Sequence, residues 1–138
     1  MLRNIIAVVV GLFVGSLINM GLIRLNTEVL FPMPEGTSTE DTEAFNAYLA
    51  GLPATAFLVV MAAHLLQSLV GAFIAARIAA ARPMLVAMIV GVLSLVGGVA
   101  ALFMFEGPAW MPVELPFYLI LAWFAGRIEV RRRGDGQG

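Results

Sequence analysis

Four long runs of apolar residues make up most of the chain, and short segments rich in polar residues and proline separate them. The runs cover residues 5–23, 54–78, 84–105 and about 113–128. A helix rises about 1.5 Å per residue, so helices of this length approach the ~30 Å hydrocarbon thickness of a bilayer. The pattern predicts an all-α integral membrane protein, in which four membrane-spanning helices form one bundle within a single domain of residues 1–130.

The amino-acid composition supports this class and excludes several others. The chain of 138 residues is 61% hydrophobic and 12% charged, whereas soluble domains average roughly 45–50% apolar and about 25% charged residues. A net charge of −1 argues against a nucleic-acid partner. The chain has no cysteine and a single histidine, so thiolate chemistry and a multi-histidine metal site are excluded within one chain. We therefore expect no metal and no cofactor.

The arginines are distributed unevenly among the segments that connect the runs. With the N-terminus in the cytoplasm, the arginines that fall inside are Arg3, Arg77, Arg82, Arg127, Arg131, Arg132 and Arg133. Arg24 falls outside. Short cytoplasmic loops of membrane proteins carry an excess of Lys and Arg. We therefore expect both termini to lie in the cytoplasm and the protein to reside in the bacterial inner membrane.

The acidic residues and the C-terminal arginines complete this distribution. The outer segments would carry the acids Glu28, Glu35, Glu40, Asp41, Glu43, Glu106 and Glu114, and the four apolar cores would carry none. Residues 131–138 are interpreted as a flexible cytoplasmic tail rich in Arg and Gly. Within it, Arg131, Arg132 and Arg133 are interpreted as a topology signal. The alternative is a contact with anionic lipid, at about 1 kcal/mol per arginine.

The outer segment of residues 26–53 is predicted to contain one short helix. The alternate prolines Pro32 and Pro34 favour an extended strap before it, and Thr37 with Glu40 fits a capping box at its start. The large apolar side chains that share one face of this helix are Phe45, Tyr48 and Leu49. We expect the helix to lie on the outer membrane surface or to cap the bundle; the alternative is a solvated acidic connector.

Few polar side chains interrupt the apolar runs, and they form a candidate cluster of Asn19, His64, Gln67 and Ser68. His64 and Gln67 are three residues apart and therefore lie on one helix face, while Asn19 lies in the outer half of the first run. We expect His64 to pair with Asn19 or Gln67. The cluster is interpreted as interhelical hydrogen bonding, worth about 0.6 kcal/mol per bond. The alternative is a polar pathway or ligand site, with His64 titrating near neutral pH.

Arg24 ends the first apolar run, and Glu28 follows four residues later. On a helix this spacing brings two side chains together, so we expect an ion pair at the outer face. Two alternatives are a pair with Glu106 or Glu114 and a contact with anionic headgroups or a substrate.

Small residues at helical spacing mark the places where helices are expected to approach one another. The candidate packing glycines are Gly11, Gly15, Gly71, Gly91, Gly98 and Gly126. Small side chains let backbones come close, and such contacts hold helices together where lipid surrounds the protein. The chain has more stripes of this kind than one bundle needs, which favours a homo-oligomer.

Several short motifs carry a resemblance to a known group of proteins. They are Asn19-Met20, the proline strap of residues 32–36, His64, Gly71-Ala72 and Ala76-Arg77. On these residues the chain resembles a loose group of uncharacterised small bacterial inner-membrane proteins with four spans. The resemblance covers most of the chain outside the arginine-rich tail. It implies the four-span topology, and it implies no activity because none is assigned to the group.

Two functions remain open on this pattern. The favoured one is a structural or accessory membrane protein that acts through helix–helix and subunit contacts, with membrane lipid, a second copy or another membrane protein as partner. The alternative is an oligomeric transporter or channel with a polar cluster at Asn19, His64 and Gln67. Small multidrug exporters are similar in length, but they require a glutamate in the first span that this chain lacks. An enzyme is not expected, because no catalytic constellation is visible.

Overall fold

The computed structural model describes residues 1–135, which contain helices and no strand, as the sequence predicts. The helices are α1 (Leu2–Leu25), the π-helix η1 (Asn26–Leu30), α2 (Thr42–Ala50), α3 (Ala54–Ile78), α4 (Pro83–Met104), the 3₁₀ helix η2 (Met111–Glu114) and α5 (Leu115–Asp135). Helix α3 has the predicted bounds, because Pro53 fixes its start and the turn before Pro83 follows its end.

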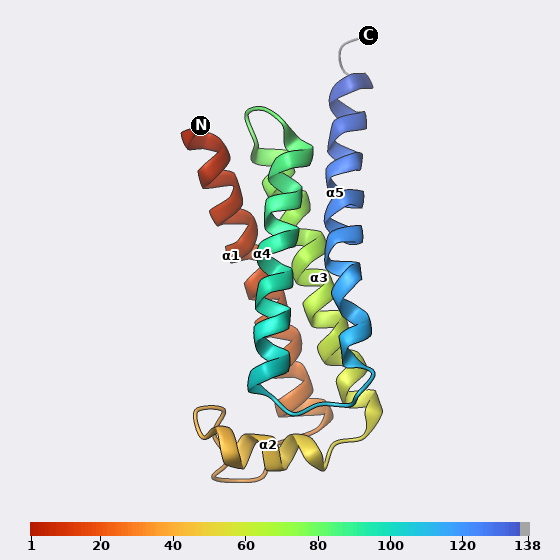
Figure 1. Ribbon diagram of the computed structural model, residues 1–138. Helices are drawn as coiled ribbons and strands as arrows, with labels where there is room; N and C mark the ends of the chain where they lie inside the picture. The colour runs from red at the N-terminus through yellow and green to blue at the C-terminus, as the bar shows by residue number, and fades with distance from the viewer. Residues whose placement is uncertain (136–138) are drawn as a thin grey trace.

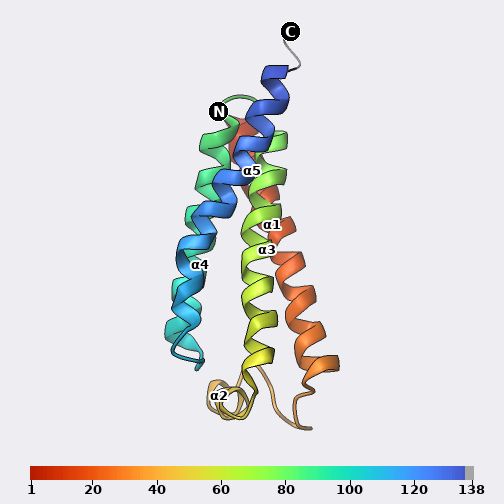
Figure 2. The same cartoon turned by 90° about the vertical axis from the view of Figure 1, so that its right-hand side faces the viewer.

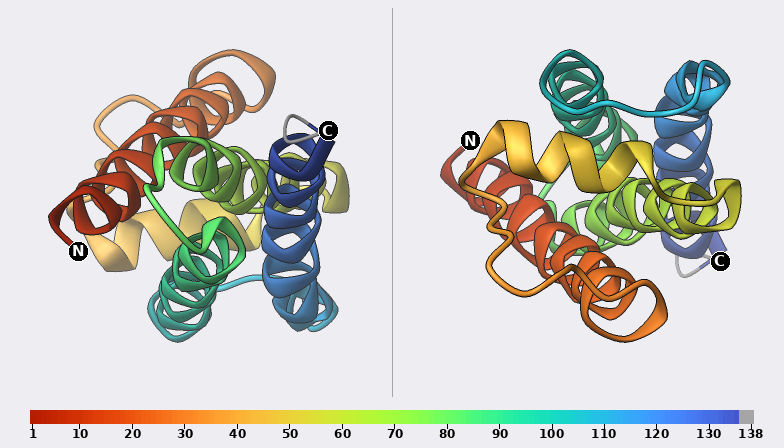
Figure 3. Two further views of the ribbon diagram at one scale, coloured as in Figure 1. Left: turned by 90° about the horizontal axis from the view of Figure 1, so that it is seen from above. Right: turned by 90° about the horizontal axis from the view of Figure 1, so that it is seen from below.

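Four long helices lie side by side, and α3 packs against each of the other three (Figure 1). The N-terminus, the α3–α4 turn and the C-terminal part of α5 lie at one end of the molecule, which we call the terminal end. Helix α2 and the connection between α4 and α5 lie at the opposite end, which we call the α2 end. Figure 3 shows α2 crossing the ends of the long helices when the molecule is seen from below.

Three of the long helices are long and apolar enough to cross a membrane. The first is the continuous segment Leu2–Leu30, formed by α1 and η1, and the other two are α3 and α4. Helix α5 has 21 residues, but charged residues occupy much of its second half, from Arg127 onward. The first part of α5 is apolar and packs against α3 and α4.

Glycine lets α1 and α3 approach each other closely. A side chain at Gly71 would place its Cβ 2.8 Å from the Gly11 carbonyl oxygen, and one at Gly15 would place its Cβ 2.6 Å from the Gln67 carbonyl oxygen. Any larger residue at these positions would force the two backbones apart.

The contact between α4 and α5 is built in the same way. A Cβ at Gly98 would lie 2.5 Å from the Tyr118 hydroxyl, and a Cβ at Gly126 would lie 2.9 Å from the sulfur of Met84. Gly91 faces Ala122 with no room for a side chain. The six candidate glycines therefore all lie at contacts between helices of this one chain.

Helix α2 begins later than the sequence predicts. Its N-cap is Asp41, whose Oδ1 accepts a hydrogen bond from the Ala44 backbone N–H at 3.1 Å, so the predicted capping box of Thr37 and Glu40 is wrong. Thr37 instead closes a turn with the Pro34 carbonyl, and Gly36 permits that turn through its φ of 85°. The apolar face of α2 is buried, and it packs Phe45 and Leu49 against the long helices.

The predicted flexible tail is wrong for residues 131–135, because α5 continues as a helix through them. Arg132 and Arg133 are held by ion pairs to Glu129 on the preceding turn. Residues 136–138 of the predicted tail lie outside the described residues.

Candidate functional site

Helix α5 and the turn before it place two glutamates inside the packed helices. Glu114 and Glu129 are each 0% exposed. The sequence places Glu114 in an outer segment; the structure keeps it at the α2 end, in η2, but buries its side chain. The tight η2 turn directly before α5 positions the Glu114 side chain toward α3, where a hydrogen-bonding partner compensates for its burial.

The partner of Glu114 is His64. The Nδ1 atom of His64 lies 2.9 Å from Oε1 of Glu114, and the Tyr118 hydroxyl donates to the same oxygen at 3.2 Å. Oε2 of Glu114 has no hydrogen-bond partner among the described residues. The expected pairing of His64 with Asn19 or Gln67 is therefore wrong: the histidine joins α3 to η2, directly before α5, rather than to α1.

The other members of the predicted cluster are divided between two helix contacts. The Asn19 amide donates to Gln67 Oε1 at 2.7 Å, which ties α1 to α3. The Ser68 hydroxyl donates to the Tyr118 carbonyl oxygen at 2.9 Å, which ties α3 to α5. The structure thus brings the four residues to one region, but as separate pairs rather than as a single network.

A cavity of about 310 Å³ lies at the α2 end, between α1, α3, α4 and α2. Figure 2 shows α4 diverging from α1 and α3 toward this end, with α2 lying below the space between them. Most of the side chains that line the cavity are apolar, including Phe45, Phe57, Val60, Leu102 and Phe105. The polar side chains that line it include Asn19, Asn26, Thr27, Thr39, His64 and Glu106. A volume of this size lies at the lower end of the range of small-molecule sites.

Asn26 is a site residue that sequence reasoning missed, because it was placed in a loop. It begins the π-helix η1, which extends α1 and places Asn26 and Thr27 in the cavity wall. Asn26 is 1% exposed; its amide nitrogen donates to the Ala56 carbonyl at 3.3 Å, and its Oδ1 has no partner among the described residues. Single π-turns of this kind are frequent at functional sites.

The same π-helix explains why Arg24 and Glu28 do not pair. Both side chains are exposed, and within residues 1–135 no ion pair joins them. A π-helix has hydrogen bonds from residue i to i+5, so the α-helical spacing that would bring Arg24 and Glu28 together is lost beyond Leu25.

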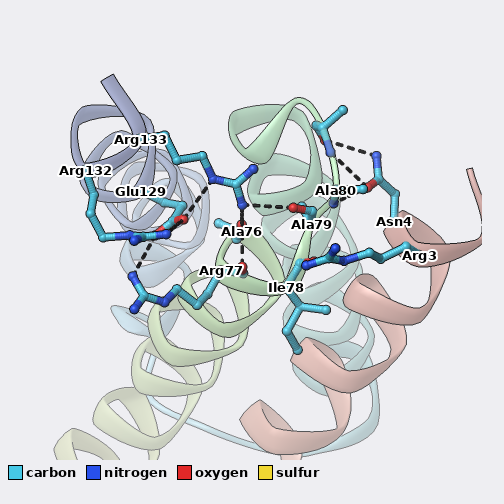
Figure 4. A network of polar contacts seen from close by, with 11 residues as sticks. Arg3, Asn4, Ala76, Arg77, Ile78, Ala79, Ala80, Glu129, Arg132 and Arg133 are labelled. Carbon is cyan, nitrogen blue, oxygen red and sulfur yellow. Dashed lines mark hydrogen bonds and ion pairs between the residues drawn. The ribbon is translucent and has the colours of Figure 1, made fainter. Parts of the chain in front are cut away.

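Glu129 at the terminal end is surrounded by three guanidinium groups (Figure 4). Arg132 donates to both carboxylate oxygens, at 2.8 and 2.6 Å. Arg133 donates to Oε1 of Glu129 at 2.9 Å, and Arg77 of α3 donates to Oε2 of Glu129 at 3.4 Å. These hydrogen bonds, with that of Arg132 as the largest cause, lower the pKa of Glu129 to about 2. The carboxylate is therefore ionised throughout the usual pH range.

Side chains of α1 and α5 also form hydrogen bonds with the backbone at the end of α3 and in the turn that follows it. Arg133 also donates to the carbonyl oxygens of Ala76 and Ala79, each at 2.9 Å, which satisfies the open end of α3. From α1, Arg3 donates to the Ile78 carbonyl at 2.8 Å, and Asn4 accepts from the Ala80 N–H at 2.9 Å (Figure 4). Arg132 and Arg133, predicted as topology or lipid residues, thus serve α5 and α3 directly, while Arg131 is exposed.

The part of the chain that the structure describes contains no group of three or more His, Cys, Asp or Glu residues placed to hold a metal ion. Comparison with known protein families, with curated proteins and with solved structures finds no match to this chain.

Proposed function

We propose that the protein is a four-span protein of the bacterial inner membrane, with both termini in the cytoplasm, that binds a small amphiphilic molecule in the cavity beneath α2. The observation that carries the proposal is the cavity itself. Its walls are mostly apolar, and it reaches His64, which is hydrogen-bonded to the fully buried Glu114. Ionisable side chains are costly within a membrane and usually mark functional sites.

The arrangement of charges supports the topology. The arginines other than Arg24 lie at the terminal end, whereas Arg24 lies in the last turn of α1, at the α2 end. The acids Glu28, Glu35, Glu40, Asp41, Glu43 and Glu106 belong to η1, α2 and the loops of the α2 end (Figure 1). The apolar first part of α5 is the proposed fourth span, and the ion pairs of Glu129 reduce the cost of carrying that charge beyond the end of the span, at the membrane boundary.

Because the chain has no cysteine, single cysteines can report this topology without background. We expect Ser38→Cys to react with a membrane-impermeant maleimide in intact spheroplasts, and Gly134→Cys to react only after lysis. Both residues are exposed, so accessibility within the fold is not limiting. Labelling of both from outside, or the reverse pattern, would contradict the proposed orientation.

A binding role fits the packing better than a channel does. Toward the terminal end the helices close on a core of small side chains, including Ala72, Ala76, Ala87 and Ala122, each 0% exposed. The cavity therefore does not continue along the helices past this core. The packing glycines that favoured a homo-oligomer are used within the chain, and the residues that line the proposed site come from the same copy.

Filling the cavity tests the proposal. Ala101 lines it, whereas Ala100 on the same helix is exposed and is not part of the wall. We expect Ala101→Phe to reduce the affinity for 2-phenylethanol, a small amphiphile, by at least tenfold, and Ala100→Phe to leave it unchanged. Saturation-transfer NMR of the purified protein in a non-ionic detergent measures this binding. Equal affinity of the two variants would refute the cavity as the site.

A further inference from the structure

We infer that the cavity selects an organic cation, an amine attached to an apolar body. This inference rests on the proposed function, because it names the chemical class of ligand for the same cavity. Three features of the wall carry it: its charge, its unused hydrogen-bond acceptor and its aromatic rings.

Acidic groups dominate the charge around the cavity. Glu106 lines it directly, and Glu114 lies behind His64, one hydrogen bond away. Among the described residues that line the cavity there is no arginine, and His64 is the one basic side chain. Its Nδ1 faces Glu114. Apolar walls of low dielectric strengthen the field of such acids, so a cationic ligand is attracted and an anionic one is repelled.

The unused polar atom in the wall is an acceptor. Asn26 lines the cavity and is 1% exposed, its amide nitrogen donates to Ala56, and its Oδ1 is left without a partner in the described part of the chain. A buried acceptor without a partner is energetically unfavourable. A protonated amine has N–H donors and no acceptor, so its binding would add no further unpaired acceptor to this wall.

Aromatic rings complete the match. Phe45 of α2, Phe57 of α3 and Phe105 after α4 all line the cavity. Phe45 and Phe105 meet edge to face, with ring centroids 5.5 Å apart. Aromatic faces attract cations and bury the apolar body of the same ligand. Three different elements therefore contribute to one apolar, electron-rich wall with acids beside it.

Three probes with similar apolar bodies test the inference: 2-phenylethylammonium, 2-phenylethanol and 3-phenylpropionate. Binding is measured by calorimetry at pH 7 in a non-ionic detergent, and the signal of Ala101→Phe is subtracted to remove partition into the micelle. We expect the ammonium probe to bind at least tenfold more tightly than the alcohol, and the carboxylate more weakly than both. If the alcohol binds as tightly as the ammonium, the inference is overturned and the binding cavity stands. If none of the three binds, the proposed function fails as well.

A second experiment removes the charge of Glu106 in the cavity wall. Glu106→Gln should lower the affinity for 2-phenylethylammonium at least threefold and leave that for 2-phenylethanol unchanged. Glu43→Gln is the matched control, because Glu43 is an exposed acid of the same end and does not line the cavity. Both glutamates are exposed, so neither variant threatens the fold. An equal loss in the two variants would show a general surface effect and would overturn the role of the cavity acid.

Discussion

Glu114 and Glu129 are both fully buried glutamates, yet their surroundings are opposite. Around Glu129 three arginines donate to the two carboxylate oxygens, and both oxygens are used. Around Glu114 a histidine and a tyrosine share one oxygen, and the other oxygen has no partner among residues 1–135. The terminal end therefore carries excess positive charge, whereas the α2 end has a carboxylate with few donors beside a cavity.

Under the proposed function, this difference separates a structural acid from an acid that acts on a ligand. A buried carboxylate with well-placed donors on every side is rigid and joins the elements that supply them, here α5 and α3. A buried carboxylate with an unused oxygen keeps its desolvation cost. Glu114 therefore fits the proposed ligand site, whereas Glu129 fits a structural role.

The largest effect is expected from Glu129→Gln. The amide cannot match the charge of three guanidiniums, so we expect the free energy of unfolding to fall by about 3 kcal/mol, the lower end for a broken buried ion pair because the arginines are partly exposed. Equilibrium unfolding in mixed micelles measures it. Glu28→Gln is the control, since Glu28 is exposed and without an ion pair in the described structure. A decrease of the unfolding free energy by less than about 1 kcal/mol would show that the ion pairs of Glu129 contribute no more than an exposed salt bridge.

The next effect is expected from Gly98→Ala. Its new Cβ would lie 2.5 Å from the Tyr118 hydroxyl, so the Tyr118 side chain must move, and overpacking of this kind costs about 1–3 kcal/mol. Gly97→Ala is the matched control on the adjacent residue, where a Cβ meets nothing within 4 Å. Alanine there should be neutral or stabilise the helix by up to about 1 kcal/mol. The same unfolding measurement separates the two variants, and identical results would contradict the close packing of Tyr118.

A smaller effect is expected from Glu114→Gln, the same substitution at the contrasting site. The amide oxygen can still accept from Tyr118 and from His64, and no arginine loses its partner, so stability should change by about 1 kcal/mol or less. Ligand binding should respond instead: in the same calorimetric measurement, the affinity for 2-phenylethylammonium should fall and the affinity for 2-phenylethanol should stay unchanged. If Glu114→Gln destabilised the protein as much as Glu129→Gln, both acids would be structural and the contrast would disappear.

The helices and their close contacts could be predicted from the sequence because their signals are local. Pro53, directly before α3, and Pro83, the first residue of α4, fixed two helix starts, and glycine spacing in α1 and α4 marked the contacts. The site could be predicted only in part. Asn19, His64 and Gln67 stood out as polar residues in apolar runs, but the partner of His64 lies 50 residues away in the sequence. No local pattern shows that the η2 turn directs Glu114 inward or that η1 extends α1.

The smallest effect is expected from moderate changes of pH at the terminal end. In the unfolded chain the pKa of a glutamate is about 4.3. In the folded protein the hydrogen bonds from Arg132, Arg133 and Arg77 lower the pKa of Glu129 to about 2. The stabilisation is therefore fully present above the unfolded pKa and is lost as the pH falls toward the folded one. The difference in unfolding free energy between the natural chain and Glu129→Gln should stay constant from about pH 7 to pH 5 and shrink below pH 4. A difference that already closes near pH 5 would show that the three arginines do not hold this carboxylate ionised, and the two ends of the molecule would then differ less than their geometry indicates.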